Sequence, residues 1–359
     1  LGTGNTVGIG INKNIYSEMY NLSFMNPYAT KDGVSLGYNV YFRETDYGEF
    51  NVANYLTNSN GFGAQFGYPT SDITRLGFNV TYDKTDIDVG TLPALEIYDF
   101  VSAEGNIFET LSVQFSWQRI TLNRGLFPTA GSSTVISLST TVPGSDLSYY
   151  RSSIRQRYYR PLSSNFVFGF SGELGYLDAY GDTEETPFFQ NFYAGGPRSL
   201  RGFESNTLGP RSTDAPCYEF NYEEKTCPNL IDTDGDGELD APYINPYAGS
   251  TSRYRDRPIG GNIKVEGSMQ LIFRLPFIED QRSLRSAFFF DFGNVFSDNC
   301  KDYQINCYKP ALEDLRYSYG VGVTWITGFG PLSLAISKPT NAGPQERTEE
   351  FQFTVGNVF

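Results

Sequence analysis

Bulky apolar residues alternate with small or polar residues along many segments of this chain, each about ten residues long. Between Tyr317 and Trp325, every odd position is Tyr, Val or Trp, and every even position is Ser, Gly or Thr. The same alternation places apolar residues at Val7, Ile9, Ile11; Leu111, Val113, Phe115, Trp117; Phe166, Phe168, Phe170; Leu332, Leu334, Ile336; and Phe351, Phe353, Val355. A period of two residues predicts β-strands with one apolar face.

The composition of the second face indicates which kind of β protein this is. In a soluble sandwich the apolar faces meet in a core, whereas in a membrane barrel they meet lipid and the small or polar face lines the lumen. Gly, Ser and Thr dominate the second face here, and aromatic residues gather near the strand ends. We therefore predict an all-β, transmembrane, antiparallel β-barrel with about 15 strands, one of them beginning near Pro187.

Several other classes of protein are disfavoured. The sequence has no His, which excludes a histidine-based catalytic triad and a His-ligated zinc site. Its net charge of -14 argues against nucleic acid as a partner. The chain has no run of 18 apolar residues and no GxxxxGK[ST] loop. We expect that this protein is not an enzyme and that it uses no energy-carrying cofactor.

Four motifs carry a resemblance to a known family. They are YAGGPRSLRGFESNTLGP at 193–210, NRGLFPTAG at 123–131, FFFDFGNVF at 288–296 and FQFTVGNVF at 351–359. Together they resemble the BamA family of outer-membrane assembly barrels, within the outer-membrane assembly and two-partner secretion transporter superfamily. The resemblance implies a 16-stranded barrel over 1–359, begun one strand late and without the preceding periplasmic repeats. It also implies that 198–258 forms a long extracellular loop folded into the lumen.

The resemblance implies a function and its partners. The domain would assemble and insert β-barrel proteins into the bacterial, Gram-negative outer membrane through a lateral seam between its first and last strands. Its partners would be nascent outer-membrane β-barrel proteins, accessory assembly lipoproteins bound through the missing periplasmic domains, and outer-membrane lipid. The alternatives are an outer-membrane diffusion channel or a related protein-secretion transporter, and more remotely a soluble β-sandwich.

The resemblance makes Arg201, followed by Gly202 and Phe203, the strongest candidate site, because in the family this arginine meets acidic residues on the barrel wall. Strand parity independently points Asp291 inward, since Phe288, Phe290 and Phe292 would face lipid. The same parity turns Glu266 and Gln270 inward on the preceding strand, and Glu266 could act as a second acid. An Arg–carboxylate pair is charge-assisted and geometrically selective. The alternative is a purely structural latch.

The last strand is the second candidate. We place Gly356 inside it, where glycine weakens pairing and permits a bend, and the resemblance implies a kinked, poorly paired seam there. The other interpretation of Gly356 is packing room for a neighbouring aromatic. Phe351, Phe353 and the terminal Phe359 also resemble the signal that the assembly machine recognises on its clients, which implies that this protein is itself a client. The other interpretation is that they are simply lipid-facing residues, and both can be true.

Three further features lie in predicted loops or on one strand. The four cysteines favour two local disulfides, Cys217 with Cys227 and Cys300 with Cys307. The run from Asp232 to Asp240 resembles a calcium loop, with carboxylates at Asp232, Asp234, Asp236 and Asp240, but Tyr243 stands where the bidentate Glu should be, so an acidic solvated loop is the alternative. Finally, a group of arginines faces either the lumen or the lipid headgroups: Arg151, Arg155, Arg157 and Arg160.

Overall fold

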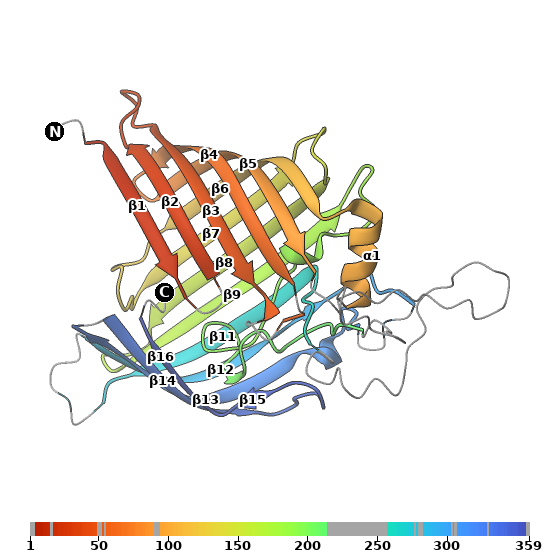
Figure 1. Ribbon diagram of the computed structural model, residues 1–359. Coiled ribbons are helices and arrows are strands. Elements are labelled where there is room, and N and C mark those ends of the chain that lie inside the picture. Colours follow the sequence, from red (N-terminus) through yellow and green to blue (C-terminus); the bar gives the residue numbers. More distant parts are fainter. Residues whose placement is uncertain are drawn as a thin grey trace.

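The computed structural model describes residues 4–14, 17–48, 52–53, 55–89, 94–213, 257–275, 278, 283–302, 304, 307–328 and 330–356. Most of them belong to one antiparallel sheet of 14 strands, in which each strand pairs with the next member of the sheet in chain order; β10 and β15 lie outside this sheet (Figure 1). The strands are β1 (Thr6–Lys13), β2 (Ser17–Asn26), β3 (Ser35–Asp46), β4 (Leu56–Ser71), β5 (Thr74–Asp88), β6 (Ile107–Ile120), β7 (Gly131–Thr141), β8 (Tyr149–Pro161), β9 (Phe166–Ala179), β11 (Ile263–Phe273), β12 (Leu284–Phe296), β13 (Arg316–Thr327), β14 (Gly330–Pro339) and β16 (Phe351–Val355).

The sheet is strongly curved, like the wall of a barrel (Figure 1). Within the described residues no ladder joins its two edge strands, β1 and β16. A second, two-stranded ladder pairs β10 (Gly202–Phe203) with β15 (Thr348–Glu349). The predicted all-β architecture is confirmed. Of the helices that the structure describes, none combines the length and apolar composition needed to cross a bilayer.

One predicted strand is wrong. The segment from Pro187 forms the short 3-10 helix η2 (Phe188–Gln190) and continues as a loop instead of joining the sheet. Its apolar residues are buried in that loop, with Phe188 and Phe192 each about as inaccessible as core residues. The aromatic content that suggested a strand therefore reflects packing of a loop against other loops and the wall.

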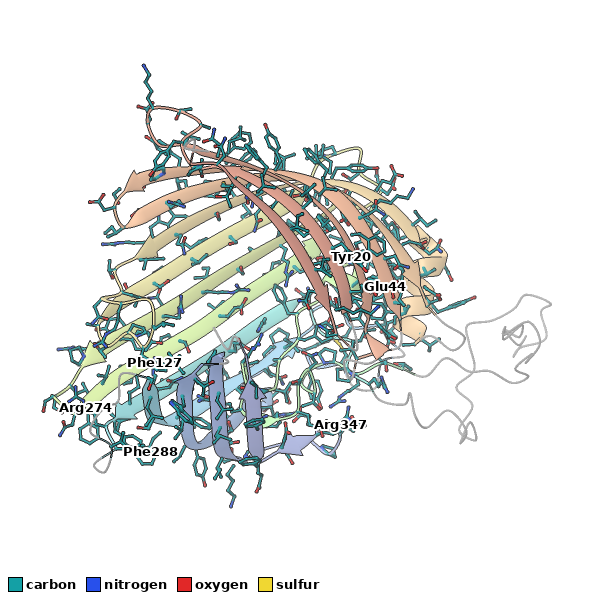
Figure 2. The ribbon with its side chains drawn as sticks, turned by 60° about the vertical axis from the view of Figure 1, so that its left-hand side comes forward. Tyr20, Glu44, Phe127, Arg274, Phe288 and Arg347 are labelled. Carbon is teal, nitrogen blue, oxygen red and sulfur yellow. A yellow bond between two sulfur atoms is a disulfide. The ribbon has the colours of Figure 1, made fainter. Side chains whose placement is uncertain are left out.

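The two faces of the sheet differ as the alternation predicted. The outer face carries exposed large apolar side chains along every strand of the sheet; for example, Ile9 is 80% exposed and Phe353 is 54% exposed. Figure 2 labels two such residues, Tyr20 and Phe288. The inner face carries small or polar residues such as Ser318 and Ser337, which are buried. An apolar surface this extensive requires a nonpolar environment, and the bilayer supplies one.

The two ends of the strands also differ. Only Asp72 and Ile73 separate β4 from β5, whereas 83 residues, 180–262, lie between β9 and β11 at the opposite end. Short turns mark the periplasmic end of an outer-membrane barrel and long loops the extracellular end. We call these the turn end and the loop end.

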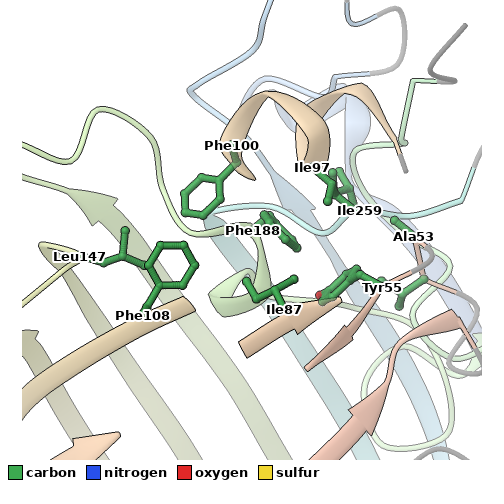
Figure 3. Close-up of a cluster of buried hydrophobic side chains, with 10 residues drawn as sticks. Ala53, Tyr55, Ile87, Ile97, Phe100, Phe108, Leu147, Phe188 and Ile259 are labelled. Carbon is green, nitrogen blue, oxygen red and sulfur yellow. The ribbon is translucent and has the colours of Figure 1, made fainter. Parts of the chain in front are cut away.

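Helix α1 (Leu95–Glu104) lies at the loop end, in the connection between β5 and β6 (Figure 1). Its Ile97 and Phe100 pack into a buried cluster with residues from several loops, shown in Figure 3. Both carboxylate oxygens of Glu96 accept a hydrogen bond from the backbone N–H of Thr213 at 3.0 Å. Burial raises the pKa of the Glu96 carboxyl, although these hydrogen bonds oppose the shift. The helix thereby holds the backbone of Thr213 in place.

Candidate functional site: the lumen loop latch

The latch is the loop segment from Ser199 to Phe203, which lies against the inner face of the C-terminal strands. Two of its residues form β10, in register with β15: Gly202 opposite Glu349 and Phe203 opposite Thr348. Glu204 extends this contact, because its backbone N–H donates to the carbonyl of Arg347 at 3.0 Å. The loop is thus attached to the segment that connects β14 with β16.

Arg201 and Asp291 form a two-pronged ion pair. Nε and Nη2 of Arg201 each lie 2.7 Å from a different carboxylate oxygen of Asp291, and the Arg201 backbone N–H donates to the same carboxylate at 3.2 Å. Asp291 is fully buried on β12, at an inward position between outward Phe290 and Phe292. A planar guanidinium can donate to both oxygens of a carboxylate at once, whereas the ammonium of lysine acts as a point charge, so lysine would not replace Arg201 in this pair.

Two further contacts fix the guanidinium of Arg201. Nη2 also donates to Ser268 Oγ at 3.0 Å, from β11. The group lies over the ring of Phe289, with Cζ 3.5 Å from the ring centroid. Phe289 precedes Asp291 by two residues, so both point inward from β12. The guanidinium is thus held by a carboxylate, a hydroxyl and an aromatic face, and the Arg201 side chain is mostly buried.

The structure brings Glu266 and Gln270 to the same wall but gives them other partners. Glu266 accepts a hydrogen bond from Ser199 Oγ at 2.5 Å and forms an ion pair with Lys264 at 3.2 Å. Gln270 donates to Ser268 Oγ at 3.3 Å. The expectation that Glu266 could share Arg201 is corrected: Glu266 holds the beginning of the latch through Ser199, and Asp291 holds the arginine.

Gly202 and Phe203 meet different requirements. Gly202 has φ +91°, and a Cβ there would lie 3.2 Å from Ser337 Oγ and 3.3 Å from Ser318 Cβ. Only glycine combines that conformation with such a close approach to the wall. Phe203 is fully buried in a cluster with Leu200, Leu208 and residues of the wall.

Gln352 on β16 is a site residue that the sequence reasoning missed. Its amide Nε2 donates to the Phe203 carbonyl at 2.7 Å, and its Oε1 accepts from the Gly202 N–H at 3.3 Å. It is only 2% exposed. The signal was available, because parity places a polar residue between Phe351 and Phe353 on the inner face. The latch therefore binds the last strand directly as well as β12.

At the end of β16, the expected position of Gly356 needs correction. The strand ends at Val355, so Gly356 lies one residue beyond the ladder. It has φ +106°, its N–H donates to the Pro331 carbonyl at 2.9 Å, and no described atom lies within 4 Å of a Cβ built there. The left-handed backbone, and not packing room for an aromatic, favours glycine. Phe351 and Phe353 are exposed on the outer face, and Phe359 lies outside the described residues.

The other predicted residues are distributed as follows. Cys300 and Cys307 form the predicted disulfide. Cys217, Cys227 and the calcium-loop aspartates Asp232, Asp234, Asp236 and Asp240 lie outside the described residues, so the second disulfide and the calcium site stay predictions.

The arginines of β8 divide between the two faces. Arg151 lies over the Phe192 ring at 4.2 Å, and Arg155 pairs with Glu173 at 2.9 Å, both on the inner face. Arg157 shares that face by parity, whereas Arg160 shares the outer face with Ile154 and Tyr158.

Comparison with known proteins decides the family. A family profile described as the Omp85 superfamily domain matches residues 1–359, which is the whole chain. The chain belongs to the Omp85 superfamily. As an Omp85 domain it is an outer-membrane β-barrel, as the alternation predicted.

Individual relatives agree with this assignment. The chain is 29% identical to the outer membrane protein assembly factor BamA of Neisseria meningitidis over 100% of its own length and 44% of that protein. It is 22% identical to the mouse sorting and assembly machinery component 50 homolog, over 90% of the chain and 59% of the relative. The crystal structure of BamA from Haemophilus ducreyi lacking POTRA domains 1-3 is similar, with a TM-score of 0.80, 28% identity, and 99% and 64% of the two chains covered. This Omp85 chain thus spans about half the length of the relatives that it matches.

Proposed function

We propose that this domain assembles and inserts β-barrel proteins into the bacterial outer membrane, and that a client strand adds to the exposed edge of β16. The observation that carries the proposal is the attachment of the latch to the last strand, β16, through Gln352. The names of the BamA and sorting-and-assembly relatives support the assembly role. The chain spans only part of those proteins. That its substrates are nascent outer-membrane β-barrel proteins, and that accessory lipoproteins assist it, therefore belongs to the proposal as well.

The pairing of β16 favours strand addition. Its ladder with β14 covers only the five residues Phe351–Val355, opposite Leu332–Ile336, although β14 itself has ten. In the described part of the chain, the other side of β16 has no strand beside it. Each unsatisfied backbone group in hydrocarbon costs several kcal/mol, so an incoming strand would gain main-chain hydrogen bonds without regard to its sequence.

The latch supplies the rigidity that such an edge requires. Arg201 ties the loop to β12, and Gln352 ties it to β16, so the loop spans the inner side of β13 and β14. A strand with five paired residues would otherwise fray easily. In this mechanism the latch has no chemical step: it holds the last strand in register while clients pair with it.

Disulfide trapping of a client tests the proposal. Thr354→Cys on β16 is expected to form an adduct with a cysteine in the terminal strand of a stalled client, in cells that carry the full-length protein. Ser137→Cys, also inward-facing but on the central strand β7, is the matched control. Equal adduct yields at both positions, or none at position 354, would contradict strand addition at β16.

A diffusion channel is the second candidate. It is favoured by the inner face of β1, where Thr6, Gly10 and Asn12 are exposed and small or uncharged. A steady, high single-channel conductance in planar bilayers, unaffected by Arg201→Ala, would support a channel in place of an assembly factor.

A further inference from the structure

Cations on the outer face of the sheet differ in whether a carboxylate of the described residues faces them; at the loop end, exposed Lys338 on β14 forms no ion pair with one. At the loop end, two outward lysines each face a carboxylate directly across a strand pair. Lys13 lies 2.5 Å from Glu18, and Lys84 lies 2.9 Å from Glu109. Their charges are neutralised within the protein.

At the turn end, the outward cations are arginines, and their surroundings differ. Arg119 is the last residue but one of β6, and Arg160 holds the same position on β8. Both side chains are exposed. Among the described residues, neither forms an ion pair with a carboxylate.

Arg119 begins a polar row that crosses three strands. It is in register with Thr134 on β7, which is in register with Gln156 on β8. The Thr134 hydroxyl donates to the Gln156 side-chain oxygen at 2.6 Å. The Gln156 amide donates one hydrogen to the Arg157 carbonyl at 3.2 Å, which leaves its second hydrogen for another acceptor.

The neighbouring row toward the middle of the membrane is wholly apolar. Two residues along each strand, Trp117, Ile136 and Ile154 stand in register on the same outer face. Ile136 and Ile154 are 40% and 45% exposed, as lipid-facing residues are. The polar row therefore lies where acyl chains give way to headgroups, at the depth where a tryptophan belt is expected.

We infer that the row Arg119, Thr134 and Gln156 binds the phosphate of an anionic glycerophospholipid in the periplasmic leaflet. A guanidinium presents several donors to a phosphate, and the second amide hydrogen of Gln156 offers one more. The Thr134 hydroxyl, whose hydrogen is donated to Gln156, orients that amide. The acyl chains of that lipid then lie on Trp117, Ile136 and Ile154. A protein partner does not fit the row as well, because the apolar surface continues directly into the lipid-facing wall. The inference requires only the membrane location and is independent of the assembly function.

Tryptophan fluorescence provides the test, because the chain has only two tryptophans, Trp117 and Trp325. In a Trp325→Phe variant, Trp117 is the remaining tryptophan. Its fluorescence then reports on the lipid next to it, two residues from Arg119. The full chain is reconstituted in phosphatidylcholine vesicles that contain a minor fraction of dibrominated phosphatidylglycerol or, separately, the same fraction of dibrominated phosphatidylcholine. We expect the quenching to correspond to an enrichment of phosphatidylglycerol beside Trp117 of about fivefold, the effect of one arginine near an anionic surface.

Arg119→Gln is expected to remove the preference, and Arg119→Lys to retain part of it. Arg124→Gln is the matched control, since Arg124 is an exposed arginine in the adjoining turn. Heat-modifiable migration shows which variants are folded, and Arg119→Lys tests the site if the glutamine variant fails to fold. Equal quenching by the two brominated lipids, an unchanged preference in folded Arg119→Gln, or an equal loss in Arg124→Gln would overturn the inference.

Discussion

The first and last strands of the sheet are both edges, but the structure supports them very differently. Inward positions of β1, such as Thr6, Gly10 and Asn12, are exposed, and among the residues that the structure describes the only strand paired with β1 is β2. Inward Gln352 of β16 is buried beneath the latch, which bonds to it from both Gly202 and Phe203. An edge with few ladder hydrogen bonds can thus be made rigid from inside the barrel. If the latch causes that difference, disrupting it should weaken β16 more than the rest of the sheet.

The largest effect is expected for Arg201→Ala. It leaves the fully buried Asp291 carboxylate without its cation, which costs about 3–5 kcal/mol for a buried pair. The folded barrel should lose its resistance to heat in gel migration, and client assembly in cells should fall with it. Arg155→Ala is the control, because the exposed Arg155 side chain pairs with Glu173 for no more than about 1 kcal/mol. Unchanged heat resistance and unchanged porin assembly in Arg201→Ala would remove any role for the latch.

Gly202→Ala should have the next largest effect. An alanine at this position would have to adopt the left-handed backbone conformation of Gly202, and its Cβ would approach Ser318 and Ser337. Together these cost about 1–3 kcal/mol. We expect a lower midpoint in urea unfolding from vesicles. At Gly125, in a turn, a Cβ meets no atom within 4 Å. A similar loss in Gly125→Ala would show that the effect is not specific to the latch.

Gln352→Ala separates the anchoring of the last strand from global stability. It removes two hydrogen bonds to the loop and leaves the buried Phe203 carbonyl and Gly202 N–H without these partners. The expected loss of stability is about 1–3 kcal/mol. Hydrogen exchange should accelerate in β16 while β7 stays protected. Gln118→Ala, an inward glutamine on β6, is the matched control. Uniform acceleration across the sheet would argue that Gln352 contributes only to overall stability.

The smallest effect is a pH dependence at the loop end, remote from both edges. The Glu96 pKa is raised by burial, so ionisation opposes the docking of α1. Protection of α1 from hydrogen exchange, corrected for intrinsic rates, should be greatest below the ordinary carboxyl pKa. It should decrease as pH rises from there through the raised value. Glu96→Gln should abolish the dependence and Glu104→Gln should not. Identical profiles for the two variants would show that Glu96 is not the responsible group.

Much of the fold could be predicted because strand parity is local. Two residues of alternation place one side chain on each face, whatever the sheet does elsewhere. This is why Asp291, between outward phenylalanines, was correctly placed inward, and why the alternating segments such as 317–325 were correctly assigned to strands. The prediction of a strand at Pro187 was wrong because aromatic residues are common both in strands and in buried loops.

The sequence by itself determined which face of each strand meets lipid, since that depends only on the order of adjacent residues. Tertiary structure alone decided that Glu266 bonds to Ser199 instead of acting as a second acid for Arg201, although Glu266 and Asp291 both point inward. It also decided that Gln352 meets the loop from 150 residues away along the chain. Such pairings depend on the register of many consecutive ladders and on the curvature of the sheet. A shift by two residues in any one ladder would preserve every face and still change every partner.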